Sequence, residues 1–444
     1  MRVGFAGFTY MDGKGEENNE VAFLKRMANV LVDKNADVTY FHRESLNGID
    51  MKDTFDHMEI PADRVNIEQY TNFPFNEFKQ YSDEEIAYGY KGHIPEDKSY
   101  KDQAELKRNN INKIIRGLEN VRIYTESNPV DLFIVFGNYL ISNIVKVYCR
   151  KHNIKYLVLE NGYFRPFTLM ADPNGVNFES SIPKDLAFYQ TVEVDEVLLK
   201  QFIDKPQEAY ADREYTFEER KKFYKFFDIS IEEAKTRASV DSNLSLVTDS
   251  LKDINAEYIY VPFQLETDSQ ITKHSPSIKT MKHLVELTSE ALMNYNRNNN
   301  KNLKIIYKVH PLYESELHRM DLAGIEEICA GSEELILLKK GNNQQLLEQA
   351  KMVITINSTV GFEALLQYKN VITLGEAFYA IDGISTSWSE GKDLENLITR
   401  VIERGPNIDN IKRFIYHLRF NYFAEIFWKN PDLKSMEKLV EKII

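Results

Sequence analysis

The sequence predicts an α/β protein with two parallel β-sheets, one in each half of the chain. Short runs rich in β-branched and aromatic residues alternate with segments of helical periodicity from one end to the other. Because parallel strands need crossover connections, this alternation is typical of parallel sheets covered by helices. The length of 444 residues is sufficient for two domains, each with its own hydrophobic core.

The predicted strands are short and apolar, as expected of strands buried on both faces. They span residues 3–8, 37–41, 131–136 and 155–159 in the first half, and 258–262, 304–309, 335–338, 352–356 and 371–374 in the second. We expect an N-terminal domain over residues 1–190 and a C-terminal domain over residues 255–400. Residues 191–254, charged and of helical period, predict a helical insert between them. Residues 401–444 predict C-terminal helices that pack back across the domains.

The composition indicates an ordinary soluble protein, with 43% hydrophobic and 28% charged residues. A net charge of −13 argues against a general nucleic-acid surface, which needs a basic field. The chain has no uninterrupted apolar run of about 18 residues and no signal-peptide pattern at its start. We therefore expect a cytoplasmic protein that binds no nucleic acid. Cys149 and Cys329 lack partners at ligand spacing, so we expect small core residues instead of a disulfide or a zinc site.

The segment after the predicted strand 352–356 has the composition of a nucleotide-binding loop. Asn357, Ser358 and Thr359 offer polar side chains at the start of a helix, where unpaired N–H groups attract an anion. Glu363 lies four residues after Thr359 on the same helix face, and a carboxylate there can accept hydrogen bonds from two ribose hydroxyls. The alternative is an ordinary capping box, in which Ser or Thr precedes Glu.

A second polar cluster follows the predicted strand 258–262. Gln264, Asp268 and Ser269 offer an amide, a carboxylate and a hydroxyl close together. This set suits a polyhydroxylated substrate held beside a nucleophile or base, although Asp268 and Ser269 could simply cap the next helix.

Lys308 and His310 form a third cluster, at the end of the predicted strand 304–309. They lie two positions apart on one face of the strand, and Pro311 ends the strand. An ammonium and an imidazole at the edge of a sheet predict an anion site.

In the first half of the chain, an acid, a turn and an arginine follow the predicted strand 155–159. Glu160 with Arg165 nearby could act as an acid or base. Asn161-Gly162 would also account for a tight turn without any chemistry, and the sequence leaves both interpretations open.

Several common catalytic motifs are missing from the sequence. It contains no Gly-x-Gly-x-x-Gly, P-loop, His-Glu-x-x-His or Gly-x-Ser-x-Gly pattern. Dinucleotide redox, ATP-driven and serine-hydrolase functions therefore lack support. No cluster has the composition of a Mg²⁺ carboxylate cage, so we expect neither a metal nor a cofactor. Phe378 and Tyr379 could stack on a base, but core packing is favoured.

Five clusters, taken in order, resemble the capsule polysaccharide synthesis family. This family includes the bacterial retaining β-Kdo glycosyltransferases, which use CMP-Kdo. The clusters that carry the resemblance are residues 160–166, 264–269, 308–311, 357–363 and 373–379. The resemblance covers residues 130–385, and its last cluster is the most specific.

The resemblance implies a GT-B-like architecture, in which two Rossmann-type domains face a central cleft. The N-terminal domain would bind the acceptor and the C-terminal domain the nucleotide sugar. The implied activity is transfer of a 3-deoxy-ulosonic acid, with Kdo as the expected sugar, from a CMP-sugar donor to a glycan or glycolipid acceptor. It would serve capsular or surface polysaccharide biosynthesis through a retaining double displacement.

The resemblance also assigns roles at the matching positions. Asp268 would be the nucleophile and Glu160 the acid/base partner. The residues expected to hold the nucleotide and its phosphate are Lys308, His310, Ser358, Thr359 and Glu363. Those expected to line the substrate site are Arg165, Gln264, Ser269 and Asn357.

The sequence departs from the family pattern at three positions. Asn161 stands where the family usually has a second acid, Val309 where it has Pro, and Asn138 where it has Asp. The first and third changes remove carboxylates from the expected cleft, on the side that would hold the sugar.

Two other functions are compatible with these clusters. A phosphotransferase that moves an alditol phosphate from a CDP-activated donor would use the same anion sites without needing Asp268 as a nucleophile. A non-catalytic scaffold could bind a nucleotide or an acidic glycan, but Asp268, His310 and Glu363 argue against a dead site.

The stretch 413–429 is unusually aromatic and locally basic. Its apolar content favours a helix packed across both domains. The alternative is a peripheral contact with the inner face of the cytoplasmic membrane, where a lipid-linked acceptor would lie.

Overall fold

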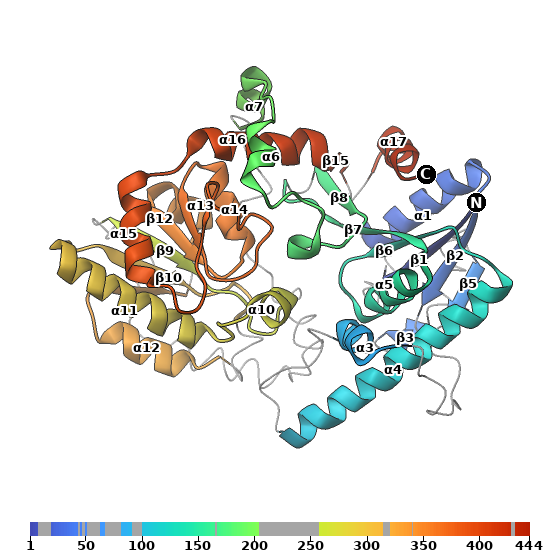
Figure 1. Ribbon diagram of the computed structural model, residues 1–444, viewed down its shortest axis with the longest axis horizontal. Helices are drawn as coiled ribbons and strands as arrows, with labels where there is room; N and C mark the ends of the chain where they lie inside the picture. Colours follow the sequence, from blue (N-terminus) through green and yellow to red (C-terminus); the bar gives the residue numbers. More distant parts are fainter. Residues whose placement is uncertain are drawn as a thin grey trace. The chain divides into compact units, whose positions relative to one another are not determined.

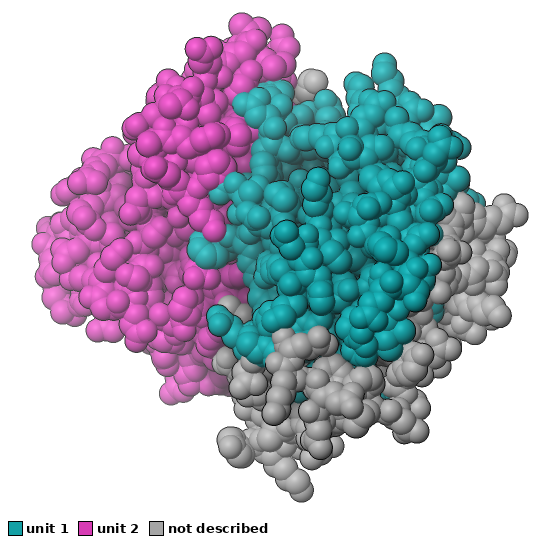
Figure 2. All heavy atoms as spheres, turned by 45° about the vertical axis from the view of Figure 1, so that its right-hand side comes forward, with its two compact units in different colours: residues 1–182, 419–444 teal, residues 183–418 magenta. Residues whose placement is uncertain are grey.

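The computed structural model describes residues 1–7, 19–42, 45–46, 49–50, 63–66, 81–90, 100–164, 167–203, 257–313, 320–339, 341–427 and 431–444. These residues form two compact units, coloured separately in Figure 2. Unit 1 comprises Met1–Ile182 with Arg419–Ile444, and unit 2 comprises Pro183–Leu418. Most of the expected helical insert, residues 204–254, lies outside the described residues.

Unit 1 is built on a seven-stranded sheet in the order β15-β8-β7-β6-β1-β2-β5 (Figure 1). Its parallel strands are β1 (Arg2–Ala6), β2 (Asp37–His42), β5 (Asp63–Asn66), β6 (Leu132–Phe136) and β7 (Lys155–Asn161). Its antiparallel strands are β8 (Thr168–Asp172) and β15 (Ala424–Glu425). A separate two-stranded ribbon joins β3 (Ser45–Leu46) and β4 (Ile49–Asp50).

Helices of unit 1 form two packed groups. One group is α1 (Asn19–Asp33) with α17 (Leu433–Ile443), and the other is α3 (Asp83–Tyr90), α4 (Tyr100–Ser127) and α5 (Leu140–His152). The first group shares one hydrophobic core with the sheet, in which Phe5, Leu31 and Met436 are completely buried. The C-terminal helix of the chain is therefore part of the N-terminal sheet domain.

The antiparallel edge of unit 1 differs from the purely parallel sheet that the alternation predicted. A short connection that begins at Gly162, instead of a crossover helix, leads to β8, and so short a connection suits antiparallel strands. The Gly162 N–H donates to the Thr168 carbonyl at 2.8 Å. A Cβ atom at Gly162 would lie 2.2 Å from Thr168 Oγ1, so position 162 requires glycine.

Unit 2 is built on a six-stranded parallel sheet in the order β11-β10-β9-β12-β13-β14. Its strands are β9 (Tyr258–Pro262), β10 (Lys304–Lys308), β11 (Leu335–Leu338), β12 (Met352–Thr355), β13 (Asn370–Thr373) and β14 (Thr386–Ser387). The strand order reverses direction between β9 and β12, as it does in Rossmann folds. Every strand predicted in both halves of the chain is present, which confirms the fold class of two Rossmann-like α/β domains.

Helices cover both faces of the second sheet. On one face, α11 (Met281–Asn299) packs against α12 (Leu322–Ala330) and α15 (Leu394–Arg404). Contacts with β9, β12 and β13 place α13 (Asn343–Gln349) and α14 (Thr359–Leu366) against the sheet as well, and α16 (Ile408–Tyr416) packs on α14. The shorter elements are η2 (Asn177–Glu179) in unit 1, α6 (Leu186–Gln190), α7 (Glu196–Ile203) and α10 (Ser269–His274) in unit 2, and the π-helical turn His417–Tyr422.

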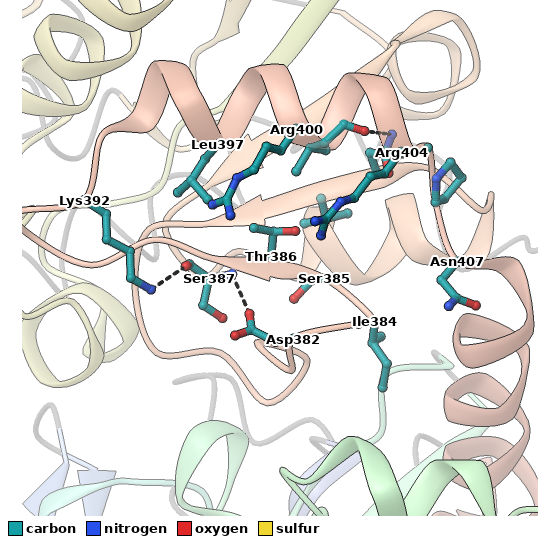
Figure 3. A pocket seen from close by; sticks show the side chains of 16 residues that line it. Asp382, Ile384, Ser385, Thr386, Ser387, Lys392, Leu397, Arg400, Arg404 and Asn407 are labelled. Atoms are coloured by element: carbon teal, nitrogen blue, oxygen red, sulfur yellow. Dashed lines mark hydrogen bonds between the residues drawn. The ribbon is translucent and has the colours of Figure 1, made fainter.

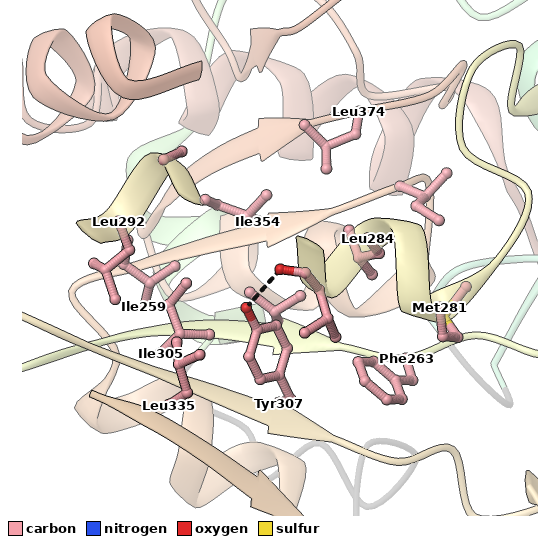
Figure 4. Packing of buried hydrophobic residues seen from close by; sticks show 14 of the residues in the cluster. Ile259, Phe263, Met281, Leu284, Leu292, Ile305, Tyr307, Leu335, Ile354 and Leu374 are labelled. Carbon is pink, nitrogen blue, oxygen red and sulfur yellow. Dashed lines mark hydrogen bonds between the residues drawn. The ribbon is translucent and has the colours of Figure 1, made fainter. Parts of the chain in front are cut away.

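The core of unit 2 is dense and apolar (Figure 4). Ile259, Ile305 and Ile354 from three adjacent strands are completely buried together. Burial of side chains of this size contributes about 1.5–3 kcal/mol each. The hydroxyl of Tyr307, which is completely buried in this core, is hydrogen bonded to the Thr288 hydroxyl at 2.9 Å. The strands that lead to the candidate site are therefore anchored in a well-packed core.

The aromatic residues of the stretch 413–429 that the structure describes pack mainly into the two units. Phe414 is completely buried in unit 2, 5.2 Å from the ring of Tyr189. Phe423 is buried in unit 1, with its ring 5.5 Å from that of Tyr163. Phe427 is 38% exposed. Trp428 and Lys429 lie outside the described residues.

The residues predicted to be core residues elsewhere are also buried. Phe378 and Tyr379 are 3% and 0% exposed, so they are core residues and not a base-stacking pair. Cys149 and Cys329 are buried free thiols, and burial raises the pKa of both.

Asp172 organises the turn after β8 and ties the C-terminal segment to unit 1. Its completely buried carboxylate accepts hydrogen bonds from the N–H groups of Asn174 and Gly175 at 2.7 and 3.0 Å. It also accepts from the Ser181 N–H at 2.8 Å and from the Tyr422 hydroxyl at 2.5 Å. One carboxylate thus holds three segments of unit 1 together.

We expect Asp172→Asn to lower the free energy of unfolding by about 2–4 kcal/mol. An amide cannot accept at both terminal atoms, so at least one buried donor loses its partner. Tyr422→Phe is the matched control, because it removes one of these bonds and should cost about 1 kcal/mol. Urea unfolding of the two variants measures both effects. A smaller loss for Asp172→Asn than for Tyr422→Phe would contradict this role.

Candidate functional site

The polar clusters predicted in the second half of the chain lie at one edge of the sheet of unit 2. In the strand registers, Lys308 pairs with Pro262 and Thr355 pairs with Thr373. All of these strands are parallel, so the segments that follow them emerge at the same carboxyl edge. In open α/β sheets this edge, at the point where the strand order reverses, is where ligands bind.

Gln264 and Asn357 form a reciprocal pair across the point where the strand order reverses. Gln264 Nε2 donates to Asn357 Oδ1 at 2.9 Å, and the Asn357 N–H donates to Gln264 Oε1 at 3.2 Å. Both residues are buried, at 9% and 6% exposure. We call this pair the switch-point clamp. It joins the segment after β9 to the segment after β12.

Asn357 extends the clamp to two further segments. Its Nδ2 donates to the carbonyls of Gln270 and His274 in α10, at 2.8 and 3.1 Å. The Glu376 N–H in turn donates to the His274 carbonyl at 2.8 Å. The Asn357 amide is thus bonded to the protein on both sides. This geometry favours a positioning role for Asn357 over direct contact with a substrate.

Asp268 caps α10 and presents one free carboxylate oxygen. Its Oδ1 accepts from the Gln270 N–H at 2.8 Å and from the Ser269 hydroxyl at 3.4 Å. Oδ2 accepts from no group in the described part of the chain. The side chain is exposed to solvent. The protein around it nevertheless desolvates the charged form, and this desolvation raises the pKa of the Asp268 carboxyl. The Gln270 N–H acts in the opposite direction, because it stabilises the charged form.

His310 is a neutral donor with a defined tautomer. Its Nδ1 accepts from the Leu312 N–H at 3.1 Å, which assigns the proton to Nε2. Burial, assisted by the charge of Lys308, lowers the pKa of His310 to about 4. The imidazole is therefore uncharged at neutral pH and offers Nε2–H as a hydrogen-bond donor.

Lys308 supplies the positive charge beside His310. It is 5% exposed, and its Nζ donates to Asn343 Oδ1 at 2.9 Å. The Tyr260 hydroxyl donates to the same Asn343 oxygen at 2.7 Å. Asn343 thus orients the ammonium, a contact that sequence spacing could not indicate because it joins two segments 35 residues apart.

The start of α14 combines a helix cap with an exposed hydroxyl. Ser358 is the N-cap, and its Oγ accepts from the Val360 N–H at 3.2 Å, so capping is part of its role. Thr359 is exposed, and neither its hydroxyl nor its N–H bonds to a described residue. Glu363 is partly buried one turn further along the helix. Ser358 therefore caps the helix, while the adjacent Thr359 is available to bind a ligand, so the two interpretations are compatible.

Tyr379 contacts the backbone at the start of α14. Its hydroxyl donates to the Ser358 carbonyl. Gly361 allows this approach, since a Cβ atom there would lie 2.3 Å from the Tyr379 hydroxyl oxygen. The sequence predicted that Tyr379 is a core residue, but it did not indicate this hydrogen bond.

A buried histidine and Glu376 form a further pair that sequence reasoning missed. His274 Nδ1 lies 3.3 Å from Glu376 Oε2, and the His274 side chain is 3% exposed. Glu376 belongs to the most specific of the five clusters, which was the available signal for it.

The predicted residues of the first half belong to unit 1. Glu160 is the penultimate residue of β7, and its Oε1 accepts from the Asn161 N–H at 2.9 Å. Its Oε2 faces Gly137, where a Cβ atom would lie 3.4 Å away. Asn138, the next residue, accepts from the completely buried Lys146 Nζ at 2.8 Å. Arg165 lies outside the described residues.

The arrangement as a whole defines a class of site. Unit 2 brings together Gln264, Asp268, Ser269, Lys308, His310, Asn357, Ser358, Thr359 and Glu363 at one sheet edge. This edge offers hydrogen-bond donors, a buried positive charge and a helix N-terminus for an anion, with a carboxylate on a neighbouring strand end. It has the composition of an anion-binding site in a Rossmann-like domain. Glu160 belongs to the other unit.

The family follows from a comparison with known proteins. The family model described as capsule polysaccharide biosynthesis protein matches residues 133–395, more than half of the chain. The chain belongs to this family. The match includes all five clusters on which the resemblance rested.

Two curated relatives are similar over part of their length. Protein FixF of Sinorhizobium fredii (strain NBRC 101917 / NGR234) is 28% identical over 275 residues, which cover 61% of this chain and 54% of that protein. Capsule polysaccharide export protein KpsS of Escherichia coli is 26% identical over 258 residues, which cover 54% of this chain and 65% of that protein. The chain thus spans between half and two thirds of these relatives.

Two solved structures that are similar to this chain are of KpsC from Thermosulfurimonas dismutans. The β-Kdo 2,7 transferase is 17% identical with a TM-score of 0.41, covering 73% of this chain and 90% of that one. The β-Kdo 2,4 transferase is 17% identical with a TM-score of 0.37, covering 70% and 88%. At these TM-scores, neither match adds to the family assignment.

Two further properties concern the described residues alone. Every helix among them is too short or too polar to span a bilayer. Within the same residues, no three side chains of His, Cys, Asp or Glu gather as metal ligands.

We expect the stability of the protein to fall as the pH decreases from about 6.5 to 4. The folded-state pKa of His310 is lowered to about 4 from 6.5, so in this window the unfolded chain binds a proton that the folded protein does not. The effect is at most about 3 kcal/mol. His310→Gln, which cannot titrate, should lose less stability across the window in thermal unfolding. Parallel pH profiles for the two proteins would contradict the lowered pKa.

Proposed function

We propose that this protein is a glycosyltransferase of surface polysaccharide biosynthesis. It transfers a 3-deoxy-ulosonic acid, with Kdo as the first candidate, from a CMP-sugar to a glycan or glycolipid acceptor. The mechanism is a double displacement that retains anomeric configuration. The assignment rests on family membership, on the five clusters and on the anion site at the carboxyl edge of unit 2.

One observation carries most of the proposal: the groups that we propose to bind the phosphate and a carboxylate lie on segments that meet at a single switch point. The clamp holds the segments after β9 and β12 together, with Asp268 on the first and Ser358–Thr359 on the second. A nucleotide phosphate at the start of α14 would therefore lie beside the segment that bears the carboxylate. This is the arrangement that nucleophilic displacement at a sugar phosphate requires.

Asp268 is suited to be the nucleophile. The hydrogen bonds to Oδ1 fix the carboxylate, while Oδ2 is free to react. In the first step Oδ2 would bond to the anomeric carbon as the bond from that carbon to the CMP phosphate oxygen breaks. CMP leaves with the electron pair, and the sugar remains as an ester on Asp268.

The leaving phosphate needs stabilisation but no proton. Donation from His310 Nε2–H, the charge of Lys308 and the N-terminus of α14 would each stabilise the negative charge that develops on it. His310 is neutral, so its contribution is an oriented hydrogen bond and the formal charge comes from Lys308.

The second step needs a base. An acceptor hydroxyl would attack the anomeric carbon, the ester to Asp268 would break, and a carboxylate would take the hydroxyl proton. We assign this base to Glu160, following the family resemblance. Two inversions give net retention.

Asp268→Asn should abolish transfer while leaving the fold intact. Asparagine is as good an N-cap as aspartate, so α10 keeps its cap, but the amide cannot act as the nucleophile. We expect a loss of at least about 10³-fold in kcat, with unchanged CMP affinity and melting temperature. Intact-protein and peptide mass spectrometry of the unmodified enzyme with CMP-Kdo, without acceptor, should find the sugar on a peptide containing residue 268.

Two outcomes would overturn these roles. If Asp268→Asn retains transfer, Asp268 is only a helix cap. If the adduct maps to Glu160, the two carboxylates have exchanged roles. Release of an alditol phosphate from CDP-glycerol, without turnover of CMP-Kdo, would favour the phosphotransferase instead.

Glu363→Ala should weaken CMP binding about tenfold or more, because each hydrogen bond between the carboxylate and the ribose is worth about 1.5 kcal/mol or more. Calorimetry with CMP measures this directly. Glu290→Ala is the control, since Glu290 is an exposed acid on α11 away from the carboxyl edge. Equal CMP affinity in all three proteins would restrict Glu363 to a role in the helix.

A further inference from the structure

A polar pocket lies beside β13 and β14 in unit 2 (Figure 3). It has a volume of about 760 Å³. Its walls come from the start of β13 at Asn370 and Val371, from the loop and strand 382–387, from α15, and from the residues that precede α16. The candidate site described above begins where β13 ends, at Thr373. The pocket runs along β13 and the edge strand β14, and none of its lining residues belongs to the candidate site.

Two arginines project from α15 toward this pocket, as Figure 3 shows. Arg400 and Arg404 are one helical turn apart on the same face. Both are exposed, and neither forms a hydrogen bond or an ion pair with any residue that the structure describes. Like charges at this spacing repel each other in the absence of a counter-ion.

The remaining lining residues leave the pocket positively charged. Lys392 adds a third cation, and its Nζ donates to the Ser387 carbonyl at 3.3 Å. Asp382 is the one acid among the lining residues, and its Oδ1 accepts from the Ser387 N–H at 3.2 Å. A chain with 68 acidic and 55 basic residues has ample acids to pair its arginines. The unpaired cations at this concave surface therefore point to an anionic ligand.

The polar groups between the cations narrow the kind of anion. Thr386 and Asn407 line the pocket beside the arginines and can bond to hydroxyl groups, as can the second oxygen of Asp382. A carboxylate in the pocket would disfavour a bare phosphate but would accept a hydrogen bond from a sugar hydroxyl. The volume is in the range of small-ligand sites, enough for one or two sugar residues.

We propose that this pocket binds a carboxylate-bearing saccharide, with Arg400 and Arg404 on the carboxylates and Asp382 with Thr386 on the hydroxyls. It would be a second, non-catalytic site, built from other residues of unit 2 than the switch-point clamp. The inference stands on the charges and the shape of unit 2 alone and does not need the transfer reaction proposed above. A site of this kind would retain an acidic glycan on the protein.

The test compares binding of digalacturonate, maltose and inorganic phosphate, measured by ligand-observed NMR and calorimetry. Digalacturonate should bind the unmodified protein, and Arg400→Gln/Arg404→Gln should weaken this binding about tenfold or more. Arg297→Gln, at an exposed arginine on α11, should bind as the unmodified protein does. Maltose, which has the hydroxyls but no carboxylate, should not bind detectably.

A folding control is built into the same variants. Because removal of two repelling charges relieves strain, the double variant should melt no lower than the unmodified protein. Unchanged digalacturonate binding in the double variant, or binding of maltose as strong as that of digalacturonate, would overturn the proposal. Binding of inorganic phosphate without digalacturonate would reduce the pocket to a general anion site and would also overturn it. A lower melting temperature would show that the arginines are paired in solution, against the premise.

Discussion

The hydrogen-bonded pair of Gln264 and Asn357 is the interaction on which the rest of the site depends. Parallel strands deliver their following segments to one edge, but nothing in a sheet prevents these segments from separating beyond it. The clamp supplies that constraint, because each residue both donates to and accepts from the other. Through Asn357 Nδ2 it also fixes α10, and therefore the cap residue Asp268. Burial strengthens these bonds and makes their loss costly.

The electrostatics of the edge follow from what burial does to each group. Burial keeps His310 neutral and leaves one nitrogen as a donor, while Lys308 keeps its place through Asn343. Asp268 is exposed and retains a free oxygen. The result is a positive, donor-rich surface next to an available carboxylate in a chain of net charge −13. A local field of this kind can attract an anionic donor that the whole molecule would repel.

Much of this arrangement could be predicted from the sequence, and the remainder has identifiable physical causes. Short apolar runs predicted the strand positions. The polar clusters could be recognised because they follow strand ends, where open α/β sheets bind their ligands. The strand β8 was not predicted, although a turn at Asn161-Gly162 was one of the two interpretations left open for the segment that precedes it. Asn357 was expected to face the substrate. Its partners Gln264, Gln270 and His274 lie more than 80 residues away, so sequence spacing could not indicate these hydrogen bonds.

The most direct test is a crystal structure of the protein with CMP bound. We expect the phosphate within hydrogen-bonding distance of His310 Nε2 and of the Thr359 N–H, with the ribose hydroxyls at Glu363. The clamp should be unchanged, since it serves to hold the edge in its binding conformation. CMP bound to unit 1, or bound to unit 2 away from His310 and α14, would contradict the assignment of this edge as the donor site.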